Sequence, residues 1–197
     1  QAVVSADGRY AVFTTRSRNF FADDDPDPAG RFRAGGIFRR DLSTGALELV
    51  AYGDLRDEER RDDLIVRGAQ NPSVSADGRW IAFSTAAQLV PQDVNGNVDV
   101  YVRDMARAPA VPGAYELISA RDGGDVPASY GAPIVDRPGA NPGADVTPGH
   151  AISADGRYVA FRTSFIASDL PDAASPTVGQ LQVLVRDRQT RHTVLLT

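Results

Sequence analysis

Apolar residues along this chain gather into short runs, and three of the runs follow one nine-residue pattern. The pattern is Ser-Ala-Asp-Gly-Arg, an aromatic residue, two apolar residues and Phe, and it occurs at residues 5–13, 75–83 and 153–161. Successive side chains of a strand point to opposite faces. In the second copy, Trp80 and Ala82 therefore occupy one face and Phe83 occupies the other. Because both faces are apolar, a sheet built on this strand needs cover on both sides.

Further elements accompany each copy, so that each unit divides into four short strands. A segment before the turn gives the first strands, at residues 2–5, 72–75 and 151–153. The apolar run after the turn gives the second strands, near residues 9–15, 79–85 and 157–163. The third strands end in Arg-Asp and lie at residues 37–41, 100–104 and 183–187. The fourth strands are closing apolar runs at residues 47–50, 115–118 and 193–196. The Asp-Gly pair supplies the positive φ angles of a tight hairpin.

This repetition predicts an all-β fold made of β-propeller blades, as three four-stranded antiparallel sheets. A β-sandwich is the competing interpretation, but its strands need not recur as a fixed four-part unit. We expect residues 1–197 to form one propeller segment with no helix longer than a turn or two. The predicted blades lie at residues 1–52, 71–120 and 150–197. The long loops that join them lie at residues 53–70 and 121–149.

Three blades are too few for the rings of about four to eight blades that propellers close. We therefore expect the chain to be part of a six- to eight-bladed ring, completed by additional blades or by a second copy. We favour additional blades, because the chain starts without methionine and ends on an apolar strand. Until covered, the outer faces of the first and third blades should expose residues such as Ala11 or Tyr10 at one end and Val159 or Tyr158 at the other.

The repeat resembles the TolB-like propeller family, whose WD-like repeats carry a Ser/Pro-x-Asp-Gly turn. The resemblance rests on the three nine-residue copies and on residues 89–104, which read Leu-Val-Pro-Gln-Asp-Val-Asn-Gly-Asn-Val-Asp-Val-Tyr-Val-Arg-Asp. It implies a bacterial protein whose blades serve as a protein-binding scaffold in the periplasm or outside the cell. Some members of the family are fused to hydrolase domains. Gly36 and Gln182 stand where the second unit has Asp99, a departure that argues against a ligand site repeated in every blade.

Composition narrows the classes of function. The formal net charge is −5, which argues against nucleic acid as a partner. No apolar run reaches the roughly 20 residues of a membrane-spanning helix, so we expect no membrane insertion. There is no cysteine, no Gly-x-Ser-x-Gly elbow, and the two histidines are His150 and His192. The sequence therefore carries no catalytic signature. Glycoside cleavage needs a pair of carboxylates, and the pattern of the many aspartates marks out no particular pair.

Two acidic segments are candidates for cation binding. Asp93, Asn95, Asn97 and Asp99 place side-chain oxygens at alternate positions, and calcium prefers six to eight oxygen ligands. The segment lacks the glycine spacing of an EF-hand, and the alternative is a turn held by Asn and Asp side chains bonded to the backbone. The second segment, residues 23–27, is a solvated loop in the simpler interpretation. We expect no other cofactor.

The leading hypothesis is a non-catalytic propeller scaffold for protein–protein interaction. The alternatives are the propeller portion of a larger peptidase-type hydrolase and a propeller that binds or cleaves carbohydrate. Tyr10, Trp80 and Tyr158 occupy the same place in each unit and could form a binding stripe. Equivalent positions of a repeat usually perform equivalent packing, however, so we expect these rings to fill the space between blades.

Overall fold

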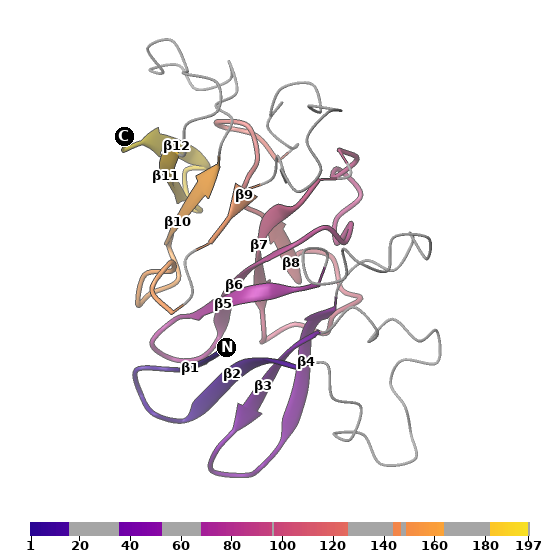
Figure 1. The fold of residues 1–197 in the computed structure, drawn as a ribbon, viewed down its shortest axis with the longest axis vertical. Helices are drawn as coiled ribbons and strands as arrows, with labels where there is room; N and C mark the ends of the chain where they lie inside the picture. Colours follow the sequence, from indigo (N-terminus) through magenta and orange to yellow (C-terminus); the bar gives the residue numbers. More distant parts are fainter. Residues whose placement is uncertain are drawn as a thin grey trace.

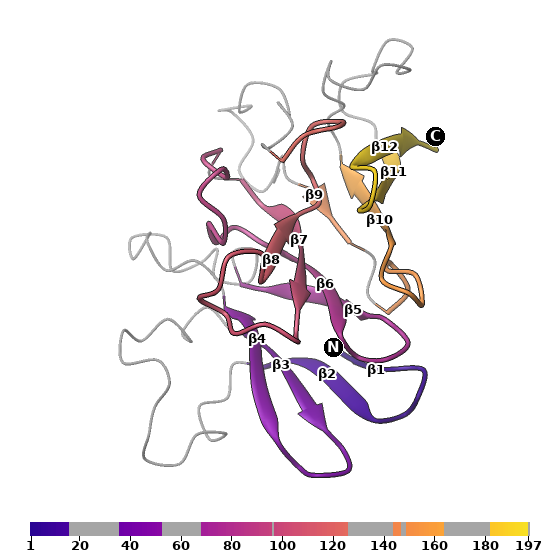
Figure 2. The same ribbon diagram turned by 180° about the vertical axis from the view of Figure 1, so that it is seen from behind.

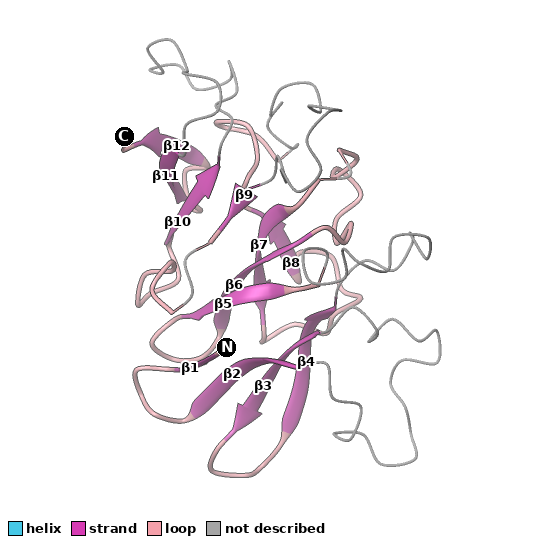
Figure 3. Cartoon of the chain, viewed as in Figure 1, coloured by secondary structure: helices cyan, strands magenta, loops and turns pink. Residues whose placement is uncertain are grey.

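The computed structural model describes residues 1–15, 36–52, 68–95, 97–125, 144–146, 149–163 and 182–196. These residues form twelve strands and no helix (Figure 3). The first sheet contains β1 (Ala2–Val4), β2 (Tyr10–Thr15), β3 (Gly36–Asp41) and β4 (Leu47–Tyr52). The second contains β5 (Gln70–Val74), β6 (Trp80–Thr85), β7 (Asp99–Asp104) and β8 (Tyr115–Leu117). The third contains β9 (Ala144–Asp145), β10 (Tyr158–Thr163), β11 (Gln182–Asp187) and β12 (His192–Leu195).

Each sheet is antiparallel, and its four strands follow one another in chain order. The sheets lie one after another, with the second between the first and the third (Figures 1 and 2). This arrangement confirms the predicted fold class of three four-stranded propeller blades. The second strands begin one residue later than predicted and end where predicted, because alternation of apolar residues is read directly as a strand.

The first strand of the third blade was predicted wrongly. Residues 151–153 form no strand, and Ile152 contributes only an isolated bridge to Val159. The strand that pairs with the far end of β10 is β9, through Arg162 and Thr163. The second blade is irregular at the same place, where β5 shifts register between Gln70 and Ser73. A two-residue strand inside a segment rich in Gly and Pro gives no apolar period for the sequence to reveal.

The Ser-x-Asp-Gly-Arg turn is held by the same hydrogen bonds in every blade. In the first blade Ser5 Oγ donates to Asp7 Oδ1 over 2.5 Å and accepts from the Tyr10 N–H over 2.9 Å. Asp7 Oδ1 also accepts from the Arg9 N–H over 3.0 Å. The second and third blades repeat these three bonds with distances of 2.6 to 3.0 Å. The serine and aspartate of the motif are therefore structural groups.

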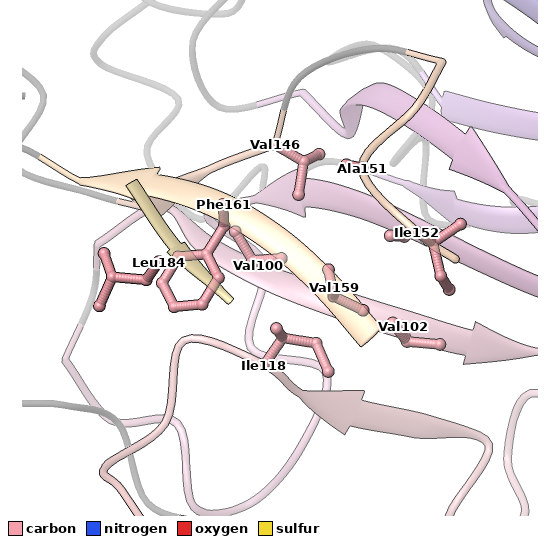
Figure 4. Close-up of a cluster of buried hydrophobic side chains, with 10 residues drawn as sticks. Val100, Val102, Ile118, Val146, Ala151, Ile152, Val159, Phe161 and Leu184 are labelled. Carbon is pink, nitrogen blue, oxygen red and sulfur yellow. The ribbon is translucent and has the colours of Figure 1, made fainter. Parts of the chain in front are cut away.

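The apolar core lies between the blades, as the two apolar faces of β6 require. Ile81 and Phe83 pack toward the first blade, in a cluster with Val12 and Ile37. Ala82 packs toward the third blade. Figure 4 shows this second cluster, which joins side chains of β7 and β10 and includes Val100, Val102, Ile118, Val146, Ile152, Val159, Phe161 and Leu184. Burial of both faces of β6 makes the second blade the centre of the fold.

In the first two blades, the aromatic residue of the motif packs on the glycine of the next blade. A Cβ added at Gly78 would lie 2.2 Å from the Tyr10 ring, and one added at Gly156 would lie 2.2 Å from the Trp80 ring. Backbone bonds join the same turns, since the Asp7 N–H donates to the Ala76 carbonyl over 3.1 Å. The aromatic rings therefore fill the space between blades as expected, and only a residue without a side chain fits beneath them.

This packing selects between the alternatives that the sequence left open for the outer faces. Tyr10 lies between the first and second blades, and Val159 is buried against the second blade. Ala11 follows Tyr10 and Tyr158 precedes Val159, so both point to the opposite faces, which are the outer faces of the first and third blades. Tyr158 is 41% exposed there. The sequence left both alternatives open because alternation fixes which residues share a face but does not say which face meets the neighbour.

The contact between ring and glycine generates a stability prediction. Gly8 and Gly156 have φ angles of +71° and +74°, but no described atom lies within 4 Å of a Cβ added at Gly8. Gly8→Ala should therefore cost only the strain of left-handed backbone, about 1–2 kcal/mol. Gly156→Ala should add a clash with Trp80 and cost roughly 3 kcal/mol in all. Urea unfolding of both variants measures the difference, and equal losses would contradict the contact.

Candidate functional site

An arginine of each turn binds the aspartate that ends the third strand of its own blade. Arg79 donates from Nε and Nη2 to the two carboxylate oxygens of Asp104 over 2.9 and 3.0 Å. Asp104 is buried and also accepts from the Ala106 N–H. Burial acts to raise the pKa of Asp104, but these hydrogen bonds outweigh it and lower the pKa. Arg9 with Asp41 and Arg157 with Asp187 form the same pair in the other blades.

Two arginines contact each interior aromatic ring. The guanidinium carbon of Arg9 is 4.9 Å from the centroid of Tyr10, and that of Arg39 is 4.3 Å from it. Trp80 is contacted in the same way by Arg79 at 4.4 Å and Arg188 at 4.1 Å. Such cation–π contacts strengthen when they are shielded from water. The rings are thereby fixed in place and are used for packing between blades.

The second arginine comes from a different position at each interface. Arg39 lies in β3 and donates to the Gly78 carbonyl over 2.8 Å. The equivalent position of β7 holds Val102, as their pairing in register shows. Arg188 instead follows the Arg-Asp pair of the third blade, where the second blade has Met105. Each interface therefore contains one arginine and one apolar residue at this pair of positions.

A glutamate at one register position accepts from the second arginine at both interfaces. Arg39 binds Glu48 of β4 over 2.5 Å, and Arg188 binds Glu116 of β8 over 2.8 Å. The equivalent residue of the third blade is Val194, which is 47% exposed. The outer face of the third blade thus presents an apolar residue where the interior faces carry a carboxylate.

Each outer face carries one of the two partners of the ring–glycine contact: the third blade presents the ring of Tyr158, and the first blade presents Gly8. On the third blade, Tyr158 has Arg157 4.8 Å from its centroid and no second arginine among the described residues. On the first blade, Gly8 has open space above it. Val4 and Leu42 are the large apolar residues of that blade that are more than half exposed. These surfaces are the exposed apolar ends that the repeat predicted.

The long connections of the fold leave the same end of the blades. Strands two and three are antiparallel, so the Ser-Ala-Asp-Gly turn and the turn after the third strand lie together at one end. The opposite end holds the strand ends that border residues 16–35, 53–69, 86–98, 118–143 and 164–181. Connections on a rigid scaffold are the usual carriers of binding function. The strand ends that border the long connections therefore lie at one end of the blades.

The connection at residues 86–98 and the first residue of β7, Asp99, contain the predicted calcium residues. Asp93 and Asp99 are both buried, with Asp93 4% and Asp99 0% exposed. Tyr101 Oη donates to Asp93, and Ser119 Oγ donates to Asp99 over 2.5 Å. Burial raises the pKa of Asp99 to about 7, opposed by the bond from Ser119 and helped by the charge of Asp93. Burial and the bond to Asp93 raise the pKa of Tyr101 as well.

The structure brings Asn95 to this pair and gives Asn97 a backbone role. The Asn95 N–H lies 3.4 Å from Asp93 Oδ1, and the Asn97 N–H donates to Asn95 Oδ1 over 2.8 Å. The turn interpretation thus describes part of the segment. Tyr101 and Ser119 were not predicted. Tyr101 lies two residues after Asp99 in β7 and so shares its face, a spacing that is visible in the sequence. Ser119 lies 20 residues from Asp99, and no local pattern connects the two.

The other candidate chemistry lies apart from this segment. His192 Nδ1 is 2.8 Å from Asp122 Oδ1 and half exposed, and His150 lies in an exposed turn. No group of three or more His, Asp or Glu residues within the described ranges is placed to hold a metal ion. Residues 23–27 lie outside the described residues. In the part of the chain that the structure describes, no helix is long and apolar enough to cross a membrane.

No family model matches the chain, and no curated protein is similar to it. Similar solved structures include one assigned to TolB from Agrobacterium tumefaciens, with 15% identity and a TM-score of 0.47, covering 100% of this chain and 49% of that one. The tricorn protease has 16% identity and a TM-score of 0.47, covering 94% of this chain and 13% of that one. TolB from Acinetobacter baumannii has 16% identity and a TM-score of 0.33, covering 100% and 43%. The chain spans less than half the length of each.

The arginine–aspartate pairs generate a prediction that depends on pH. Asp104→Asn should reduce the free energy of unfolding at neutral pH by about 1–2 kcal/mol, because a charge-assisted bond is lost and Arg79 is partly solvated. A carboxylate whose pKa is lowered on folding stabilises above its unfolded pKa of about 4, and this contribution is lost as pH falls through the folded pKa. The loss caused by the substitution should therefore shrink in acid.

Urea unfolding at neutral pH and near pH 3 measures both effects. Asp125→Asn, which changes an exposed carboxylate outside the pairs, is the matched control and should leave stability within about 0.5 kcal/mol of the parent. A loss that stays constant between the two pH values would contradict the role assigned to the ion pair.

Proposed function

We propose that this chain is a non-catalytic propeller scaffold of a bacterial periplasmic or extracellular protein, and that it binds other proteins through one end of its blades. The observation that carries the proposal is the position of the long connections, which all leave the blades at the same end. The scaffold beneath them is held by bonds that repeat from blade to blade. This combination of a rigid base and variable segments suits recognition of a folded partner.

The use of polar groups supports a role without catalysis. The serine, aspartate and arginine of every motif are bonded to one another or to the backbone. A Ser-His-Asp site needs a nucleophile beside a histidine base. Among the described residues, His192 is bound to Asp122 and no serine–histidine bond is present. The resemblance of the repeat to TolB-like propellers supports the bacterial origin and the location outside the cytoplasm.

The end faces support completion of the ring by further blades. If the third blade of one copy met the first blade of another, Val185 and Leu42 would occupy the two positions that supply the second arginine. Tyr158 would then keep only Arg157. A further blade with arginine directly after its Arg-Asp pair would restore the interior contact, as Arg188 does for Trp80. The chemistry of the faces therefore favours additional blades over a second copy.

Site-specific crosslinking tests the proposed binding end. A photoreactive residue in place of Val94, which is 81% exposed at the end with the long connections, should give a discrete adduct in an envelope or secreted fraction of the source cells. The control carries the same residue at Gln189, in a short turn at the opposite end, and should give none. Adducts from Gln189 alone would contradict the proposal.

The alternative functions give different results on the same material. Labelling by a fluorophosphonate probe that a single serine substitution abolishes would show a hydrolase. Saturable binding on a glycan array, with no protein adduct from position 94, would show a carbohydrate-binding propeller. Either result would overturn the scaffold proposal.

Light scattering coupled to size exclusion tests the end faces. The isolated chain should associate as its concentration rises, because uncovered apolar faces attract one another. Tyr158→Glu combined with Val194→Glu should reduce this association. Val111→Glu, which changes an exposed valine in the turn between β7 and β8, is the control and should not. A well-dispersed monomer at all concentrations would contradict the need for cover, and one stable species of twice the chain mass would favour a second copy over further blades.

A further inference from the structure

A pair of acidic side chains lies inside the second blade with only neutral partners. Asp93 and Asp99 receive their side-chain hydrogen bonds from Tyr101 and Ser119, which are uncharged donors. No ion pair between described residues includes either carboxylate, although Asp41, Asp104 and Asp187 all bind arginine. The contrast is internal to the fold, because the other aspartates of these strands have a positive partner.

One oxygen of the pair makes no hydrogen bond within normal geometry to any residue that the structure describes. This oxygen is Oδ2 of Asp99, a residue that is fully buried. The Asn95 amide lies beside this carboxylate and acts to lower the pKa of Asp99, but its buried Nδ2 atom reaches no described partner within normal hydrogen-bond geometry. Buried polar atoms without a partner are costly, and most of those that occur in proteins are explained by a water, an ion or a function. The unbonded oxygen therefore marks a place where a ligand would bind.

Electrostatics defines the ligand as a cation. Two carboxylates close together in a region shielded from water repel one another, and both can stay ionised only beside a positive charge. The side-chain atoms that the described residues bring together here are oxygens of carboxylate, amide and hydroxyl groups, with no histidine among them. Hard oxygen donors in an irregular connection suit calcium, which accepts irregular coordination, better than magnesium, which requires near-ideal octahedral geometry.

We propose that Asp93 and Asp99 bind one calcium ion in the second blade, with the side-chain oxygen of Asn95 and carbonyl oxygens of the same connection as further ligands. The ion ties the start of β7 to residues 86–98 and so fixes the shape of one connection at the binding end. The first and third blades have Gly36 and Gln182 at the position of Asp99, so the proposed site is not repeated at the equivalent position of those blades.

Thermal unfolding and terbium luminescence test the site together. Calcium should raise the melting temperature of the chain, by roughly 5–10 °C at a concentration a hundred times the dissociation constant. Terbium, which replaces calcium at oxygen sites, should show luminescence sensitised by Tyr101, because that ring touches Asp93. Calcium should displace terbium with a stoichiometry of one.

Three variants separate binding from folding. Asp99→Asn keeps the size of the side chain and should abolish both signals. Asn95→Ala changes a half-buried side chain, should leave the fold intact and should weaken calcium binding at least fivefold. Asp125→Asn, an exposed carboxylate elsewhere, should respond as the parent chain does. Equal responses of all three variants would overturn the proposal.

Two further results would also overturn it. The first is no change in melting temperature and no sensitised luminescence at about 5 mM ion, above the range of extracellular calcium sites. The second is a calcium-insensitive chain whose melting temperature falls between about pH 5 and pH 8 while that of Asp99→Asn does not, which would show that a proton neutralises the pair.

Discussion

The contact of an aromatic ring with the glycine of the next blade is the constraint on which this structure depends. The ring requires a residue without a side chain beneath it, and the positive φ of the Asp-Gly turn requires the same residue. One glycine thus serves the hairpin within a blade and the spacing between blades. Because the contact runs from each blade to the next, the stability of each blade depends on its neighbour, as it does in other repeat proteins.

The sequence predicted the elements well and their faces incompletely. Residues 80–85 alternate two apolar sets, and this alone implied a strand covered on both sides. The same alternation could not say that Tyr10 faces the second blade and Ala11 faces outward, because the repeat is symmetric until a neighbour is present. β9 was missed because two residues in a Gly- and Pro-rich segment carry no period, and only pairing with β10 defines it as a strand.

The candidate site was also predicted in part: its local spacing was visible in the sequence, and its burial and long-range contacts were not. Alternate oxygen-bearing residues from Asp93 to Asp99 were visible in the sequence, since local spacing is recorded there. The burial of both carboxylates was not visible, and neither was the bond from Ser119, which reaches the site from the segment after β8. Burial changes the meaning of the pattern: an exposed Asp-Asn turn needs no ion, whereas a buried one must neutralise its charge.

The second arginine at each interface, Arg39 or Arg188, comes from a different blade position, and this limits how such a protein can evolve. At the first interface the arginine comes from the leading blade, and at the second it comes from the following blade. A duplicated first blade placed after the second would bring Leu42 against Val102 and leave Trp80 with Arg79 alone. Blades here are therefore not interchangeable modules. Their order is recorded in pairs of residues that must change together, so shuffling of these units would require compensating substitutions at each new junction.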